Sequence, residues 1–267
     1  MFDEAGQTLQ RMRGRAAVAV GAEGLKRLAQ QGSAKAFLPR VHAAHPEVVF
    51  LNTAGGLTGG DRLALALEVG AGARITGTTQ PAERAYRSAS GVAEVEVRLR
   101  VGAGARLDWV PQETILFDGA GLHRRTDVRL AQDASVLMVE SVVLGRRAMG
   151  ETVRRLDFVD RRRVARGDAP VWIEPLALDD ASLARRGPAG LAGAQALAVI
   201  AFLAPGAEDA LAPVRRLLAI DGVSAGASAW DGKLVVRATA ADPGPLRRMV
   251  TTVVRQLSGG VPRVWPI

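Results

Sequence analysis

The residues best able to do chemistry lie in a glycine-rich stretch, LNTAGGLTGGDRL, over positions 51–63. Four glycines fall within six positions of this stretch: Gly55, Gly56, Gly59 and Gly60. Asp61 follows directly. Such a cluster can form a phosphate-binding loop, a metal site beside the carboxylate, or a tight backbone corner. These alternatives need different neighbours, so the surrounding sequence helps to separate them.

The phosphate-binding interpretation lacks the residues that it needs. A P-loop carries Lys and then Ser or Thr after its last glycine, whereas here Asp61 follows Gly60 and would repel phosphate. A dinucleotide fingerprint leads into a helix, whereas here the alternating segment RLALALEV indicates a strand. A backbone corner in which Asp61 accepts hydrogen bonds from turn amides is therefore favoured. A nucleotide-binding enzyme that uses the GGLTGGD loop stays the alternative interpretation.

Other catalytic chemistry finds little support. The chain has no cysteine, which excludes disulfides, thiolate metal sites and a cysteine nucleophile. His42 and His45 lie between prolines in a predicted loop, and the remaining histidine, His123, is distant in sequence. Five carboxylates could serve a paired-carboxylate hydrolase, although the sequence does not pair them: Asp61, Glu113, Glu140, Glu151 and Glu174. These observations favour a scaffold or carrier over an enzyme.

The composition limits the partners. Of 267 residues, 48% are hydrophobic, enough for one large core or two modest ones. The net charge is +8, and arginine supplies nearly all of the positive charge. A GC-rich genome alone can produce this excess of arginine over lysine, and binding to an anionic partner is the functional alternative. Aromatic residues make up only 4%, so we do not expect nucleic-acid binding.

The sequence shows neither a membrane span nor a secretory leader. Its most apolar run, ALAVIAFLAP over 196–205, is about half the length of the roughly 18 residues that a transmembrane helix needs. The N-terminal residues carry acids early and have no apolar signal region. We therefore expect a cytoplasmic protein that does not enter a membrane.

The elements that must position these residues are predicted by internal repeats. Three segments share a pattern of alternating strand, tight turn and second strand: 63–79, 95–111 and 126–141. Because no helices lie between these strands, stacked β coils or layers are expected rather than a Rossmann sheet.

The chain changes character near residue 180. A core strand over 197–204, a helix over 208–219, a hairpin over 224–240 and a helix over 243–258 follow, and the segment 185–193 is the predicted seam. The fold class is thus mainly β: a layered or coiled β body over 1–184, and a smaller β-α-β-β-α part over 185–267 with two helices. We expect the two parts to pack as one compact unit.

Charged residues inside apolar strands form a second candidate feature. Glu140 lies within LMVESVVLG, where it must either pair internally or line a wet cavity. A salt bridge from Glu140 or Glu151 to Arg146 is the simpler interpretation, and a polar channel is the alternative.

The motifs together resemble the UreD family of urease accessory proteins, called UreH in some bacteria. The resemblance runs through the chain in order: KAFLPRV, LNTAGGLTGGDRL, GARITGTTQPAERAYRS, GARLDWVPQETILFDGAGLHRRTDVRL, VESVVLGRRAMGETVRR and PRVW. The combination of GGxxGGD, PQETILFD and LGRxAxGE is specific, and the last places Arg146, Gly150 and Glu151 in a shared motif. The segment ARGDAP after LDFVDRRRV departs from the pattern.

The resemblance implies a non-enzymatic role. UreD proteins bind apo-urease and recruit UreF and the GTPase UreG, so that nickel reaches the urease active site. The resemblance implies that no cofactor is tightly bound and that Ni²⁺ binds only transiently. It also implies a homodimer of UreD within the UreD–UreF–UreG complex as a further arrangement. An internal water-filled nickel path has been proposed for the family, and the candidate residues here are Asp61, Thr76, Thr78, Glu140 and Glu174. Weak oxygen ligands suit a path that nickel must also leave.

Overall fold

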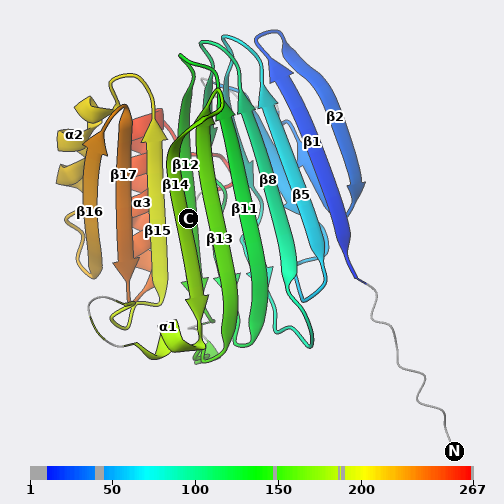
Figure 1. Ribbon diagram of the computed structural model, residues 1–267, viewed down its shortest axis with the longest axis vertical. Helices are drawn as coiled ribbons and strands as arrows, with labels where there is room; N and C mark the ends of the chain where they lie inside the picture. Colours follow the sequence, from blue (N-terminus) through cyan, green and yellow to red (C-terminus); the bar gives the residue numbers. More distant parts are fainter. Residues whose placement is uncertain (1–10, 40–44, 147–148, 186, 188–189, 266–267) are drawn as a thin grey trace, which may run out of the picture.

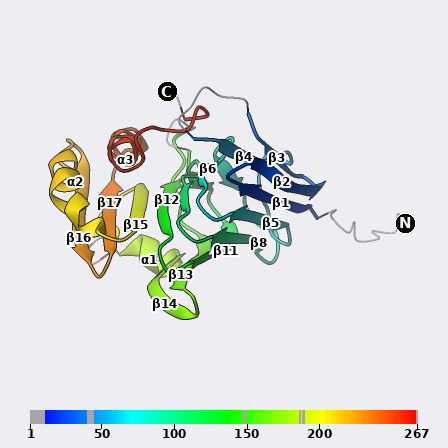
Figure 2. The ribbon, with the colours of Figure 1, turned by 90° about the horizontal axis from the view of Figure 1, so that it is seen from above.

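The computed structural model describes residues 11–39, 45–146, 149–185, 187 and 190–265. Two large sheets form most of this part of the chain (Figure 1). Figure 2 shows them from above as two layers that face each other.

The first sheet, called sheet A, has the order β14-β13-β11-β8-β5-β1-β2. Its strands are β1 (Arg13–Gly21), β2 (Gly24–Gly32), β5 (Arg62–Val69), β8 (Ala93–Val101), β11 (Ala120–Leu130), β13 (Leu156–Arg166) and β14 (Ala169–Asp179). The five central strands run parallel, and β2 and β14 pair antiparallel at the two edges.

The second sheet, called sheet B, has the main order β16-β17-β15-β12-β9-β6-β4-β3. Its strands are β3 (Ala34–Phe37), β4 (Glu47–Asn52), β6 (Arg74–Thr79), β9 (Arg106–Trp109), β12 (Ser135–Leu144), β15 (Ala196–Leu203), β16 (Val223–Trp230) and β17 (Lys233–Ala240). Two short strands, β7 (Glu83–Ala85) and β10 (Thr114–Leu116), extend from the end of β12 as a parallel ladder.

The sequence repeats fold into a β-solenoid of about four turns. In each repeat the first strand enters sheet A, the chain turns tightly, and the second strand enters sheet B, as in β5–β6, β8–β9 and β11–β12. The turns stack as well: the amide of Gly102 donates to the Val69 carbonyl at 2.8 Å, and that of Ala131 to the Val101 carbonyl at 2.9 Å. The prediction of stacked β coils is confirmed.

The core lies between the two sheets because the strands alternate as their sequence predicts. Inward residues of β5 and β8 are buried: Leu63, Leu65, Leu67, Val69, Val95, Val97, Leu99 and Val101. Burying a side chain of this size contributes about 1.5–3 kcal/mol. The stacked apolar rows therefore hold the sheets together and set which residues can point inward.

The C-terminal part continues sheet B, because β15 pairs antiparallel with β12. The helical elements are α1 (Asp180–Ala184), the 3-10 helix η2 (Ala207–Ala210), α2 (Leu211–Leu217) and α3 (Pro243–Ser258). The helix expected over 208–219 is thus a 3-10 turn followed by a short α-helix, and α1 lies outside the predicted helices. The division at 184/185 stays a prediction, and residues 186, 188 and 189 of the predicted seam lie outside the described residues.

Helix α3 has the apolar stripe that its sequence predicts. Its buried residues are Leu246, Met249, Val250, Val253 and Val254, and they pack on the face of sheet B that points away from sheet A. Asp242 caps the first turn through the Gly244 amide, and Gly259 ends the helix with φ +80°. Within the described residues, none of the helices has the length and apolar character to cross a bilayer.

Candidate functional site

The glycine-rich stretch is a backbone corner between β4 and β5. Gly55, Gly56 and Gly60 have φ of +77°, +155° and +86°, values that favour glycine. Gly59 is needed for a different reason: a Cβ there would collide with the Ser88 side chain and with the Ser90 carbonyl. The corner leads into a strand, as the sequence predicts.

Asp61 is almost fully buried, at 4% exposure, and it ties this corner to Met12, the residue before β1. Its Oδ1 accepts the Met12 amide at 2.8 Å, and its Oδ2 accepts the Thr58 amide at 2.8 Å. Because both carboxylate oxygens are held by backbone amides, the geometry accounts for a carboxylate at this position without a bound ligand.

Thr76 and Thr78 lie on β6, on the face of sheet B that points away from sheet A. Thr78 is fully buried, and its hydroxyl donates to the Val110 carbonyl at 2.7 Å. Thr76 is half-buried and stands in register between Glu47 on β4 and Asp108 on β9. Burial raises the pKa of both of these carboxyls.

Glu140 faces the other way, into the space between the sheets, where it belongs to a buried charge row. We use this name for the buried Glu140 on β12, Arg124 on β11, and Asp160 and Arg162 on β13, together with the half-buried Glu174 on β14 and the exposed Arg237 on β17 at the outer end of the row. Arg124 Nη1 lies 2.8 Å from Glu140 Oε2, and Arg124 Nη2 lies 2.7 Å from Asp160 Oδ2. Glu140 therefore pairs with Arg124 from the opposite sheet, and the salt bridge to Arg146 that was predicted for Glu140 or Glu151 is formed by Glu151.

The buried charge row continues along β13 towards the open end of the solenoid. Arg162 Nε lies 3.3 Å from Asp160 Oδ2, and Arg162 is the register partner of Glu174 across the β13–β14 pair. Glu174 binds the Arg237 guanidinium through both oxygens, with 2.7 Å from Arg237 Nε to Oε1, which joins sheet A to sheet B. Arg162, Glu174 and Arg237 also line a cavity of about 340 Å³.

The electrostatics of the buried charge row differ between its acids. Burial alone would raise the pKa of Asp160, but the charges of Arg124 and Arg162 and the Arg124 hydrogen bonds outweigh it and lower that pKa. Burial raises the pKa of Glu140, with a further contribution from Asp160, despite the nearby Arg124. The row balances three carboxylates with three guanidinium groups, so it is neutral when all six are ionised.

Arg146, Gly150 and Glu151 form a local closure near the end of β12. Glu151 Oε2 accepts the Arg146 Nε at 2.9 Å and the Arg146 amide at 3.0 Å, while Oε1 accepts the Asp118 amide at 3.2 Å. Gly150 has φ +67°, and the Arg146 guanidinium lies 4.5 Å from the Phe117 ring centroid. The predicted Glu151–Arg146 salt bridge is present.

The carboxylates that a hydrolase could use do not pair with one another. Glu113, Glu140, Glu151 and Glu174 each bind an arginine, and Asp61 binds backbone amides. His45 is described but His42 lies outside the described residues, and His123 Nε2 lies 2.9 Å from Asp157 Oδ1. Within the described part of the chain, no group of three or more His, Asp or Glu is arranged to hold a metal ion.

The structure thus places Glu140 and Glu174 in the same charge row, in which Arg162 stands in register with Glu174, and it places Asp61, Thr76 and Thr78 elsewhere. Sequence reasoning missed Arg124, Asp160 and Arg162. The available signal was their period-two spacing, which puts Asp160 and Arg162 on the same inward face of β13 as the buried Phe158 and Val164.

Comparison with known proteins identifies the family. The family model described as UreD urease accessory protein matches residues 10–266. The chain belongs to the UreD family. It is 58% identical over 263 residues to the urease accessory protein UreD of Cereibacter sphaeroides (strain ATCC 17025), with 96% of each chain covered. It is also 54% identical to the UreD of Dinoroseobacter shibae (97% and 94% covered) and 51% identical to that of Jannaschia sp. strain CCS1 (both fully covered).

Membership of the UreD family makes this chain an accessory protein in urease maturation rather than an enzyme. In the glycine corner, the Asp61 carboxylate accepts the Met12 and Thr58 amides, so an acidic group of the chain itself stands where a phosphate-binding loop would hold its anion.

Proposed function

We propose that this UreD chain is a scaffold that binds apo-urease and recruits UreF and the GTPase UreG for nickel delivery. The observation that carries the proposal is the family match across residues 10–266. The β-solenoid supports it, since two broad sheets offer extended faces to several partners. A homodimer of UreD within the UreD–UreF–UreG complex is part of the same proposal.

We further propose that Ni²⁺, as cargo, moves between the sheets along the buried charge row, from Glu140 to Glu174 and out through the 340 Å³ cavity. Each carboxylate there already has an arginine partner, so a cation must compete with a guanidinium group and is held weakly. Weak binding suits a path that the ion must leave. Asp61, Thr76 and Thr78 then serve packing and turn geometry instead.

The test uses the full chain in cells that express a urease operon with this protein tagged. The variants are Glu140→Gln, Glu174→Gln and the double variant, and the matched control is Glu68→Gln at an exposed position of β5. We expect the double variant to co-purify with urease and the accessory proteins as wild type does, while urease nickel content falls at least about tenfold. The control should leave nickel content unchanged.

Different results would contradict the nickel path and the scaffold role. Full nickel loading of urease with the double variant contradicts the path and leaves the scaffold role intact. A wild-type chain that does not co-purify with urease, UreF or UreG contradicts the scaffold role. A urea unfolding curve for each variant confirms that it is folded.

A further inference from the structure

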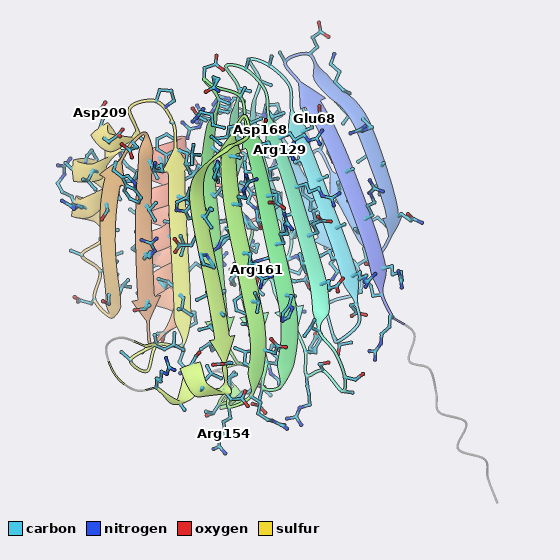
Figure 3. All side chains as sticks on the ribbon, in the orientation of Figure 1. Glu68, Arg129, Arg154, Arg161, Asp168 and Asp209 are labelled. Carbon is cyan, nitrogen blue, oxygen red and sulfur yellow. The ribbon has the colours of Figure 1, made fainter. Side chains whose placement is uncertain are left out.

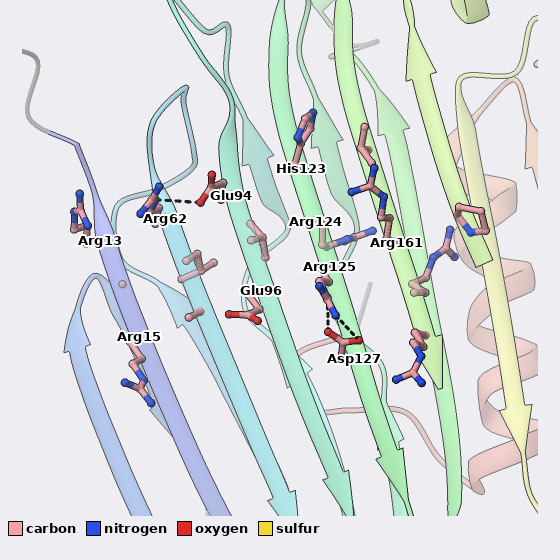
Figure 4. Close-up of a pocket in the computed structure, with 18 of the residues that line it drawn as sticks. Arg13, Arg15, Arg62, Glu94, Glu96, His123, Arg124, Arg125, Asp127 and Arg161 are labelled. Carbon is pink, nitrogen blue, oxygen red and sulfur yellow. Dashed lines mark hydrogen bonds and ion pairs between the residues drawn. The ribbon is translucent and has the colours of Figure 1, made fainter. Parts of the chain in front are cut away.

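The outer face of sheet A is hollowed into a groove of about 1040 Å³, and Arg124 and Arg162 of the buried charge row are among the residues that line it. All seven strands of sheet A contribute to its lining: β1, β2, β5, β8, β11, β13 and β14. Figure 4 shows the side chains that project into it, and Figure 3 shows Arg161 on the same open face of the sheet. In the described part of the chain, no other segment covers it.

The groove is rich in arginine, and its acidic residues are already paired. Arg62 Nε lies 3.0 Å from Glu94 Oε2, and Arg125 Nε lies 2.5 Å from Asp127 Oδ2. Glu96 Oε1 lies 2.6 Å from Arg98 Nη2. Each of the three acids that line the groove is therefore already paired with a neighbouring arginine.

Four arginine side chains at the two sides of the groove stay without an acidic partner among the described residues: Arg13, Arg15, Arg161 and Arg163. Arg13 and Arg15 lie two apart on β1, and Arg161 and Arg163 lie two apart on β13, so each pair points to the same face with about 7 Å between residues. Between the pairs lie four strand spacings, about 19 Å along the sheet.

The floor and one wall of the groove provide space and apolar contact. Ala64 stands in register with Arg15, and its small side chain leaves space at the floor of the groove beside β1. On β14, Ile173 is 61% exposed and stands in register with Arg163, and Pro175 stands in register with Arg161. An apolar side chain of a ligand can therefore pack beside the second arginine pair.

We propose that this groove binds an acidic, amphipathic helical segment of a partner protein. A helix about 10–12 Å wide fits between the arginine pairs, and carboxylates four residues apart lie about 6 Å along its axis, close to the spacing within each pair. A guanidinium group binds a carboxylate through two hydrogen bonds. A uniformly anionic nucleic acid suits the groove less well, because acids line its floor and an aromatic platform is absent from its lining.

This inference rests on the proposed scaffold role, since it assigns one face of the scaffold to an acidic partner. The probe is a fluorescein-labelled 18-residue helical peptide with glutamates four apart on both flanks and a leucine stripe between them. The comparison ligands are the same peptide with Gln for Glu and an 18-nucleotide oligothymidylate. Anisotropy titrations use the full chain at about 50 mM salt, where screening is weak.

We expect the acidic peptide to bind at least about tenfold more tightly than its Gln counterpart and to weaken as salt rises. Arg13→Gln with Arg15→Gln, and Arg161→Gln with Arg163→Gln, should each weaken it about fivefold or more. The control pair Arg100→Gln with Arg129→Gln removes the same charge from exposed positions of sheet A outside the groove and should change affinity less than about twofold.

Equal weakening by the control pair would overturn the proposal, because it would show only a generally basic face. Tighter binding of oligothymidylate that the same groove variants abolish would overturn it in favour of nucleic acid. In cells, co-purification of urease, UreF and UreG with the wild-type chain and equally with both groove variants would contradict the groove alone. Absence of co-purification with the wild-type chain would contradict the scaffold role itself.

Discussion

Arg124 and Asp160 form a bidentate ion pair inside the solenoid, with Nε 3.1 Å from Oδ1 and Nη2 2.7 Å from Oδ2. Both side chains are buried, and the same guanidinium reaches Glu140 on the opposite sheet and the Thr114 hydroxyl at 3.0 Å. One arginine thus links β11, β13, β12 and β10. Its partners lie up to 36 positions away in the sequence, so the link depends on the stacking of the solenoid turns.

Removing the charge of Asp160 should destabilise the fold strongly. Asp160→Asn leaves the buried Arg124 and Arg162 without the carboxylate that they share, and an uncompensated buried charge costs about 3–5 kcal/mol. Asp127→Asn breaks the exposed pair with Arg125 on the same sheet and should cost less than about 1 kcal/mol. Urea unfolding measures both, and equal losses for the two variants would contradict the role assigned to the buried pair.

Asp61 should behave as a structural tie. Asp61→Ala leaves the Met12 and Thr58 amides without their acceptor, which should lower the free energy of unfolding by about 2–4 kcal/mol. Thr58→Ala is the matched control, because it keeps the Thr58 amide bond and loses only a partly exposed hydroxyl contact. If Asp61→Ala keeps wild-type stability while urease nickel loading falls, Asp61 belongs to the nickel path instead.

The solenoid was predictable because its signals are local. Alternation along 63–69 and 95–101 marks which residues point inward, and the repeat places a tight turn after each strand. The helix over 243–258 was predictable for the same reason, since its apolar stripe and its glycine stop lie within one segment. Strands of three residues such as β7 and β10 carry too few residues for a pattern.

The buried charge row was only partly predictable, because its pairs join different turns of the solenoid. The position of Glu140 inside an apolar strand showed that it needs a partner. Arg146 was the nearest candidate in sequence, whereas the actual partner, Arg124, is brought opposite Glu140 by the packing of sheet A on sheet B. The groove on sheet A depends on the register of all seven strands of that sheet, so no single segment of the sequence contains it.

Glu83 should make the stability of the chain depend on pH. Burial raises the pKa of Glu83 to about 7, although hydrogen bonds from the Asn52 side chain and the Arg84 amide lower it. A raised pKa means that the folded state holds the proton more tightly, so this stabilisation is complete below about pH 4.5 and is lost as pH rises through about 7. The wild-type chain should therefore lose up to about 3 kcal/mol relative to Glu83→Gln between pH 4.5 and 8. A difference that stays constant with pH would contradict the shift.

The two glycines Gly55 and Gly59 should respond differently to alanine. At Gly55 a Cβ would meet open space, so only its φ of +77° opposes the substitution, at about 1 kcal/mol. At Gly59 the Cβ would collide with the Ser88 side chain and the Ser90 carbonyl, and it would lie 2.8 Å from the Gly91 carbonyl oxygen, so Gly59→Ala should cost about 2–3 kcal/mol or more.

A second substitution separates the two sources of this clash. Ser88→Ala removes the hydroxyl that faces Gly59 but leaves the Ser90 and Gly91 carbonyls in place. A side-chain substitution cannot remove the Ser90 and Gly91 carbonyl oxygens, so Ser88→Ala should restore only part of the stability that Gly59→Ala loses. Thermal unfolding of the single and double variants measures this. Full restoration would mean that the side chain alone requires glycine at this position. Equal effects of alanine at Gly55 and Gly59 would mean that backbone conformation, rather than close packing, determines the corner.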